Sequence, residues 1–162
     1  MRRRGREGLC GALVAFMLLL PLDARAHDPT LHLEAADYPR LVARWERLRT
    51  KDTARISQVH VNGRPTLLAF MDRNCTPCLS MVPVVEDLKK VLEGRADIHV
   101  IDPEGEDPAT RTLLAKFKVW AGPQFVLLTW EGGMAGKLFG PQPQEKLLRR
   151  LERLIEDKRA SP

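Results

Sequence analysis

The chain has 162 residues, with 26 Lys and Arg against 21 Asp and Glu, and three cysteines. That length suits one domain with a sizeable core, and three cysteines exclude a small scaffold held together by many disulfides. Aliphatic residues are plentiful enough to exclude a chain that is disordered throughout. The net charge of +5 would suggest an anionic partner, but much of the excess lies in a short N-terminal segment.

Residues 1–26 have the three parts of a secretory signal peptide. Arginines crowd residues 2–6, an apolar run extends from Leu9 to Leu22, and Ala24-Arg25-Ala26 is the small-x-small pattern of a cleavage site. We expect cleavage after Ala26 and a periplasmic location. The alternative is an N-terminal membrane anchor facing the periplasm. The apolar run would rise only about 21 Å as a helix, against a hydrocarbon core of about 30 Å.

Cleavage would change both the charge and the cysteine count. The leader holds five arginines, two acids and Cys10, so the remaining 136 residues would carry a net charge of +2 and two cysteines. A near-neutral chain without a basic stripe interleaved with aromatic residues argues against nucleic acid as a partner. We expect residues 27–36 to form a tail and residues 37–158 to form the folded domain.

The first half of the domain should contain two helices around a buried strand. An amphipathic helix is predicted over residues 37–51, where Leu41, Trp45 and Leu48 recur at helical spacing. Val59 and Val61 precede the turn signal Asn62-Gly63, and residues 65–71 are typical of a buried strand. A long helix is expected to run on through Leu92, broken in its middle by Pro83 and ended at Gly94.

The second half predicts a further helix between strands. The expected elements are, in order, a strand at 97–101, a helix from Pro108, strands at 125–130 and 135–139, and a C-terminal helix at 143–158. Asp107 should cap the helix that begins at Pro108. This order indicates the α/β class, with a central mixed β-sheet flanked by helices on both faces.

The motif that could carry out chemistry is Cys75-Thr76-Pro77-Cys78, which lies between a predicted buried strand and a predicted helix. Cys75 should lie in the first helical turn, where free backbone N–H groups and the helix dipole favour a thiolate. We therefore expect its pKa to fall below the ordinary value of about 8.5. Cys78, one turn later, is expected to be more enclosed and to act as the resolving thiol. The spacing allows the pair to cycle between dithiol and disulfide.

Two other uses of the cysteine pair compete with redox activity. A zinc site needs four ligands, and beyond the two thiols only scattered histidines are present: His32, His60 and His99. A purely structural disulfide is possible in an oxidising compartment, but so short a loop gains little from chain entropy. Redox activity is the favoured interpretation, and it needs no metal or organic cofactor.

From about Pro39 to Glu156 the sequence resembles the thioredoxin superfamily. Four features carry the resemblance in register: the strand with Leu68-Ala69-Phe70, the Cys75–Cys78 motif, Pro83, and Gly122-Pro123 before a strand and a Gly-Gly hairpin. The resemblance implies a thioredoxin-like fold in which Pro123 is cis and lies beside the disulfide. It also implies that the backbone at Gly122 pairs with an extended substrate segment.

The sequence also departs from that family in three places. Asn74 stands where thioredoxins have an aromatic residue, and Ala69 falls at or next to the position of a buried acid that assists the resolving thiol. Gly122 replaces a bulky residue and should relax substrate choice. Thr76 and Pro77, the residues expected to tune the redox potential, resemble reducing thioredoxin-like proteins more than strong oxidases.

Several other residues have simpler explanations than a role in the redox chemistry. Asp72 and Arg73 are expected to form a surface ion pair. His27 would become the N-terminal residue after cleavage, where amine and imidazole together can chelate copper, although an incidental histidine is the simpler explanation. Trp120 and Trp130 are predicted to pack at strand ends, with lining of a substrate groove as the alternative for Trp120.

Together these features predict an exported thiol–disulfide oxidoreductase that reduces protein disulfides through Cys75 and Cys78. A reductase in an oxidising compartment needs a membrane or periplasmic thiol-redox partner to regenerate it. The alternatives are a disulfide oxidase or isomerase, a copper-handling protein that uses the two cysteines and a histidine, and a non-catalytic thioredoxin-like binding module.

Overall fold

The structure of the protein is a computed structural model, which describes residues 36–56 and 63–160. The helices and strands follow one another as α1 (Tyr38–Leu48), β1 (Thr66–Phe70), α2 (Thr76–Ser80), α3 (Val82–Val91), β2 (Asp97–Ile101), α4 (Pro108–Phe117), β3 (Gln124–Leu128), β4 (Met134–Phe139) and α5 (Gln144–Ala160). The expected leader, nearly all of the expected tail, and Val59, Val61 and Asn62 lie outside the described residues.

The four strands form one mixed sheet in the order β2-β1-β3-β4. Strand β1 pairs parallel with β2 and antiparallel with β3, which in turn pairs antiparallel with β4. All five residues of β1 and all five of β3 are buried. Because central strands are covered on both faces, their sequences are nearly continuous apolar runs. The predicted mixed sheet is confirmed.

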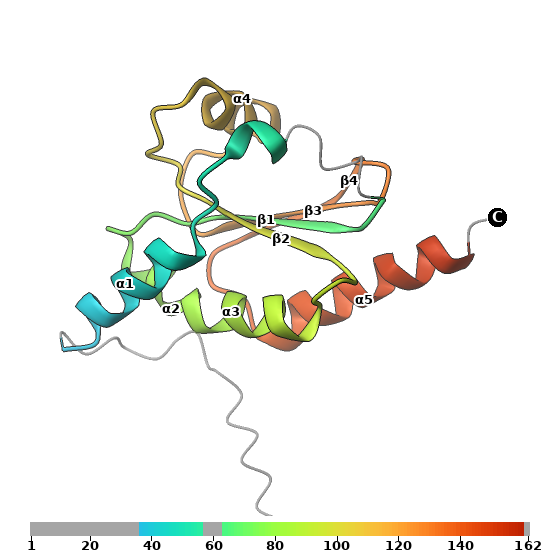
Figure 1. Cartoon of the computed structure of the whole chain (residues 1–162), viewed down its shortest axis with the longest axis horizontal. Coiled ribbons are helices and arrows are strands. Elements are labelled where there is room, and N and C mark those ends of the chain that lie inside the picture. The colour runs from blue at the N-terminus through green and yellow to red at the C-terminus, as the bar shows by residue number, and fades with distance from the viewer. Residues whose placement is uncertain (1–35, 57–62, 161–162) are drawn as a thin grey trace, which may run out of the picture.

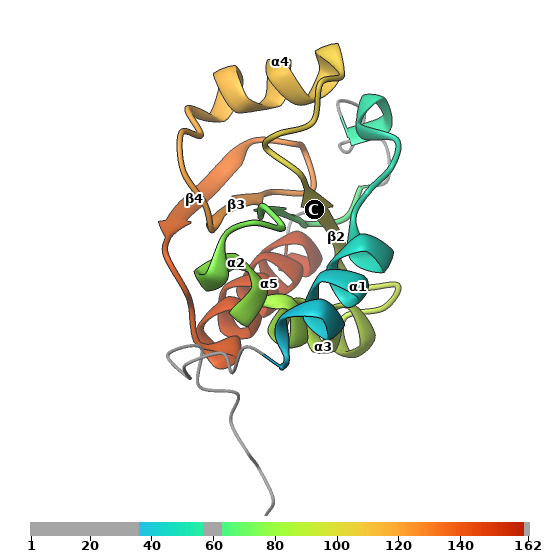
Figure 2. The same cartoon turned by 90° about the vertical axis from the view of Figure 1, so that its left-hand side faces the viewer.

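Helices cover both faces of this sheet, as predicted. In Figures 1 and 2, α1, α2, α3 and α5 lie on one side, and α4 lies on the other with the short helical turn at 53–56. Alternate residues of β1 divide between the two faces: Leu67 and Ala69 belong to a large cluster with α1, α3 and α5, and Leu68 and Phe70 to a smaller cluster with α4. Cys78 lies in the large cluster.

The helix that follows the Cys75–Cys78 motif differs from the prediction. Instead of one helix broken at Pro83, two helices meet at Met81, whose N–H donates to the carbonyl of Cys78 at 3.0 Å. Pro83 lies in the first turn of α3, where its missing N–H costs nothing. A proline that seemed to interrupt a helix therefore begins one.

The N-terminus of α4 is capped as predicted. The Asp107 carboxylate accepts hydrogen bonds from the backbone N–H of Thr110 at 2.8 Å, from the Thr110 hydroxyl at 2.6 Å and from the Thr53 hydroxyl at 2.6 Å. The hydroxyl of Thr110, followed by that of Thr53, lowers the pKa of Asp107 from 3.8 to about 2. The cap thus joins the 53–56 turn to α4.

Replacing Asp107 with alanine should lower the free energy of unfolding by about 1 kcal/mol at pH 7, because the N-cap is lost. Since the pKa of Asp107 is lower in the folded state, its contribution is present above about pH 4 and disappears as the pH falls towards 2. Urea unfolding of the wild type and of D107A at pH 7 and pH 2 measures this. D107N is the matched control, because asparagine also caps helices. An equal loss for D107A at both pH values would contradict the assignment.

In the ranges 36–56 and 63–160, no helix combines the length and the apolar character needed to cross a bilayer.

Candidate active site

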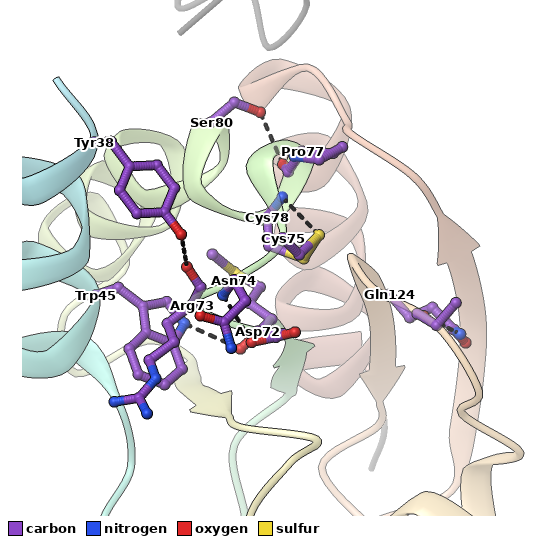
Figure 3. Close-up of a disulfide and its surroundings, with 12 residues drawn as sticks. Tyr38, Trp45, Asp72, Arg73, Asn74, Cys75, Pro77, Cys78, Ser80 and Gln124 are labelled. Carbon is purple, nitrogen blue, oxygen red and sulfur yellow. Dashed lines mark hydrogen bonds between the residues drawn. A yellow bond between two sulfur atoms is a disulfide. The ribbon is translucent and has the colours of Figure 1, made fainter. Parts of the chain in front are cut away.

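The segment between β1 and α2 is fixed from both sides. On one side, the Met71 N–H donates to the carbonyl of Ile101 at 3.0 Å, which continues the pairing with β2. On the other, the buried indole N–H of Trp45 donates to the carbonyl of Met71 at 3.0 Å, and the Tyr38 hydroxyl donates to the carbonyl of Arg73 at 3.0 Å. Figure 3 shows both side chains reaching the loop from α1. Helix α1 therefore positions the residues that precede Cys75.

The prediction that Asp72 and Arg73 form an ion pair is wrong. The Asp72 carboxylate accepts the backbone N–H of Asn74 at 2.8 Å, and its carbonyl accepts the N–H of Cys75 at 3.3 Å. The Arg73 guanidinium lies 3.4 Å from Glu46 on α1 instead. An aspartate side chain often accepts a hydrogen bond from the backbone N–H two residues later in the chain. The side chains of Asp72 and Arg73 therefore have different partners. Asp72 thereby shapes the turn into the motif.

Cys75 and Cys78 form a disulfide, with their Cα atoms 5.1 Å apart. Cys75 is the N-cap of α2, one position before the expected first turn, and its sulfur accepts the backbone N–H of Cys78 at 3.2 Å. The Cys75 side chain is half-buried, whereas that of Cys78 is completely buried. Of the two sulfurs, only Cys75 can meet a large partner, and the N–H that points at it would stabilise a thiolate there.

Gly122 and Pro123 lie beside this disulfide, and the peptide bond between them is cis. A Cβ atom on Gly122 would lie only 2.8 Å from the Sγ of Cys78 and 3.4 Å from the carbonyl oxygen of Phe70. The backbone at 122 therefore approaches the sulfur more closely than any larger residue allows. Pro123 is buried and immediately precedes β3. The structure thus brings Gly122 next to Cys75 and Cys78, from which it is distant in the sequence.

Replacing Gly122 with alanine should destabilise the oxidised protein by about 1–3 kcal/mol, because the added methyl group overpacks a buried sulfur. Gly136→Ala is the matched control, since its Cβ would meet only a guanidinium nitrogen of Arg150, at 3.2 Å, which ends a flexible side chain. That control should stay within about 0.5 kcal/mol of the wild type. Urea unfolding without reductant compares the three proteins, and equal stability of G122A and G136A would contradict the close approach.

Ala69 lies at or next to the position where the family resemblance implies a buried acid. It is completely buried in β1 and belongs to the same cluster as Cys78. In the described ranges, the buried polar residues are threonines and glutamines, and no Asp or Glu is buried. A carboxyl group that could take the proton of Cys78 from within the core is therefore missing from the part of the chain that the structure describes.

Trp120 does not pack at a strand end as expected, because the residue is 76% exposed. Instead it lines a hollow of about 250 Å³ that also borders Cys75 and Gly122. The alternative expectation, that Trp120 lines a groove beside the motif, fits this position. Trp130 is half-buried just beyond β3. The remaining motif residues, Thr76 and Pro77, are exposed in the first turn of α2.

Across residues 36–56 and 63–160, no three His, Cys, Asp or Glu side chains lie close enough together to hold a metal ion. His99 is on β2, and burial lowers its pKa. His27, His32 and His60 lie outside the described residues.

A mixed sheet that carries a Cys-x-x-Cys disulfide at the start of a helix, with a cis-proline beside it, defines a thioredoxin-like redox domain. Comparison with known families agrees: the Thioredoxin family model matches residues 48–153, more than half of the chain. The chain belongs to the thioredoxin family, and it is accordingly a thiol–disulfide oxidoreductase of the kind that acts on protein disulfides.

A curated relative supports this assignment, and solved structures match the fold. The chain is 34% identical over 87 residues to a thioredoxin of Staphylococcus aureus, an alignment that covers 54% of this chain and 79% of that protein. A solved mutant thioredoxin from Halobacterium salinarum matches with a TM-score of 0.57 and 23% identity, over 67% of this chain and 89% of that one. A thioredoxin from Fasciola hepatica matches with a TM-score of 0.51 and 26% identity, over 60% and 88%.

Two contributors to the site escaped the sequence interpretation. Trp45 was predicted only as part of the apolar spacing of the first helix. Its bond to the carbonyl of Met71 could be suspected only from the preference of a buried indole N–H for a partner. Glu104, which borders the hollow, sits in an acidic loop that carried no other signal. Both depend on contacts between distant segments.

Proposed function

We propose that the protein is an exported reductase of protein disulfides, with Cys75 as the attacking thiol and Cys78 as the resolving thiol. The observation that carries this proposal is the unequal burial of the pair: Cys75 reaches the surface at a helix N-terminus, and Cys78 does not. An exposed, activated thiol beside a buried one suits a two-step exchange that starts at one defined sulfur.

In the first step, the Cys75 thiolate attacks one sulfur of the substrate disulfide, forms a mixed disulfide and expels the other substrate sulfur as a thiolate, which takes up a proton. In the second step, Cys78 loses its proton and attacks the Sγ of Cys75, which releases the remaining substrate thiol. Two electrons pass from the dithiol to the substrate, and the protein is left with the Cys75–Cys78 disulfide.

Gly122 and Pro123 would bind the substrate segment in this scheme. The backbone at Gly122 passes beside Cys78 without a side chain, so an extended polypeptide can approach the disulfide along it. With Ala69 in place of an acid, the proton of Cys78 must leave towards solvent during the second step. We expect that step, rather than the attack by Cys75, to limit turnover near neutral pH.

The direction of electron transfer is tested by the reduction potential of the Cys75–Cys78 pair. Equilibration of the purified protein with glutathione buffers should give a value near that of thioredoxin, about −270 mV, and the reduced protein should reduce insulin. A potential near −120 mV, typical of a strong oxidase, would reverse the proposal. Thr76 and Pro77 are proposed to tune this value, so Pro77→His should shift it, whereas the exposed change Lys116→Gln should not.

Export is proposed from residues 1–26, and it is tested by mass spectrometry of the full chain produced in a Gram-negative host. A periplasmic product that begins at His27 supports cleavage after Ala26. An uncleaved chain in the membrane fraction would support the anchored alternative. In either location, a membrane or periplasmic thiol donor is proposed to reduce the Cys75–Cys78 disulfide again, because the compartment itself is oxidising.

A further inference from the structure

The hollow beside Cys75 has a chemical character that is unlike its surroundings. It lies where three segments meet: the loop before α2, the loop after β2, and the segment between α4 and β3. Its volume is about 250 Å³, and Asp72 and Glu104 are the charged residues among those that line it. Apolar side chains, Leu114 and Val119, form part of its wall. The hollow therefore combines an apolar wall with a negative rim next to the sulfur that reacts.

Trp120 adds a large aromatic surface that is held in place from outside the hollow. The ammonium of Lys137 lies 4.6 Å from the centre of the Trp120 ring and donates to the carbonyls of Phe117 and Lys118 at 2.8 Å each. Lys137 does not line the hollow. An anchored indole that is 76% exposed offers a contact surface at little entropic cost.

The negative rim is not neutralised by the protein itself. The Glu104 carboxylate has no hydrogen-bond or ion-pair partner among the described residues, and only its backbone N–H is engaged, by Asp102. The loop at 102–107 contains further acids and no basic residue. Arg73, the basic residue next to Asp72, is directed to Glu46. A cation entering the hollow would therefore meet unpaired negative charge.

We propose that this hollow binds a lysine or arginine side chain that flanks the reactive cysteine of the substrate. The aliphatic part of such a side chain packs on Leu114 and Val119, and its charged end reaches Glu104, Asp72 and the face of Trp120. This inference rests on the proposed function, because it places the substrate cysteine at Cys75. It makes the protein selective for disulfides in basic segments.

The test uses three short peptides in which both residues that flank a single cysteine are Lys, Gln or Glu. Each cysteine carries a neutral thiopyridyl group through a disulfide. Attack by Cys75 on the peptide sulfur releases thiopyridone, and Cys78 then releases the peptide thiol. The measured quantity is the second-order rate constant of thiopyridone release by the reduced full protein at low salt. We expect the Lys peptide to react about tenfold faster than the Glu peptide.

Three variants separate the hollow from general electrostatics. Glu104→Gln and Trp120→Ala should each lower the Lys-to-Glu rate ratio about threefold. Glu106→Gln is the matched control, because Glu106 is an exposed acid of the same loop that does not line the hollow, and it should leave the ratio nearly unchanged. Raising the salt concentration should reduce the Lys-to-Glu rate ratio of the wild type. A smaller preference for the Lys peptide should remain, and it should depend on Trp120.

The outcomes distinguish this inference from the function on which it rests. A ratio near one in the wild type, together with normal reaction of the Gln peptide, would overturn the inference and leave the reductase proposal standing. A strong preference that Glu104→Gln and Trp120→Ala do not change would also overturn it. If no peptide reacts, the proposed function and this inference fail together.

Discussion

Replacing Cys75 with serine should lower the rate of protein-disulfide reduction by at least about a thousandfold, because a serine hydroxyl is a poor nucleophile at its ordinary pKa. Cys78 cannot take over, since its side chain is completely buried beneath the loop. Insulin reduction by pre-reduced wild type and by C75S under the same conditions measures the loss. A C75S variant that keeps about a tenth or more of the activity would show that the assignment of Cys75 is wrong.

Cys78→Ser is the informative partner of this variant, because it keeps the attacking thiol and removes the resolving one. It should form a mixed disulfide with the substrate and then stop. A covalent complex should therefore accumulate, and a reductant should cleave it. Non-reducing electrophoresis and mass spectrometry identify what is attached, and therefore also identify natural substrates. If C78S formed no complex while C75S did, the roles of the two cysteines would be the reverse of those proposed.

Replacing Trp45 with alanine should lower the free energy of unfolding by about 3–5 kcal/mol, the range expected when a large buried aromatic residue is removed. The Trp45 side chain is completely buried between α1 and the sheet, and its indole N–H satisfies the carbonyl of Met71. The variant therefore loses core packing and also one of the bonds that hold the loop before Cys75. Urea unfolding of the oxidised protein measures the change.

Two controls separate packing from hydrogen bonding. Trp45→Phe keeps most of the apolar contact but leaves the Met71 carbonyl without its partner, so a loss of about 1–3 kcal/mol is expected. Trp120→Ala removes the same type of residue from an exposed position and should cost at most about 1 kcal/mol. Similar losses for W45A and W120A would be incompatible with the burial of these two side chains.

Local patterns predicted the elements because each pattern has a local physical cause. The strand at 97–101 was predicted with its observed bounds, and the cap of α4 followed from Asp107 and Pro108 alone. A capping carboxylate and a missing proline N–H act within one helical turn, so neighbouring residues are sufficient to predict them. The prediction for Pro83 was wrong, because a proline can occupy the first turn of a helix as well as interrupt one. The two helices meet at Met81, before Pro83.

The candidate site was predicted only in part, because it is assembled from segments far apart in the chain. The Cys75–Cys78 motif and Gly122-Pro123 were visible as short patterns. The approach of Gly122 to the Cys78 sulfur, the bond from Trp45 to Met71 and the partner of Arg73 each join residues more than twenty positions apart. Trp120 was misplaced for the same reason: an aromatic residue near a strand end is usually covered, and nothing local shows that it is not.

The division of the core into two clusters has a consequence for how the protein meets substrates of different bulk. Cys78 belongs to the larger hydrophobic cluster and Cys75 packs against it, whereas Leu114 and Val119 pack against the smaller cluster on the α4 side of the sheet. The walls of the hollow thus belong to different layers on opposite faces of the sheet. Because layers with fewer buried contacts open more readily, a slight displacement of α4 would widen the hollow without disturbing the sulfur atoms. Tolerance for substrate shape and control of the redox couple can therefore vary independently.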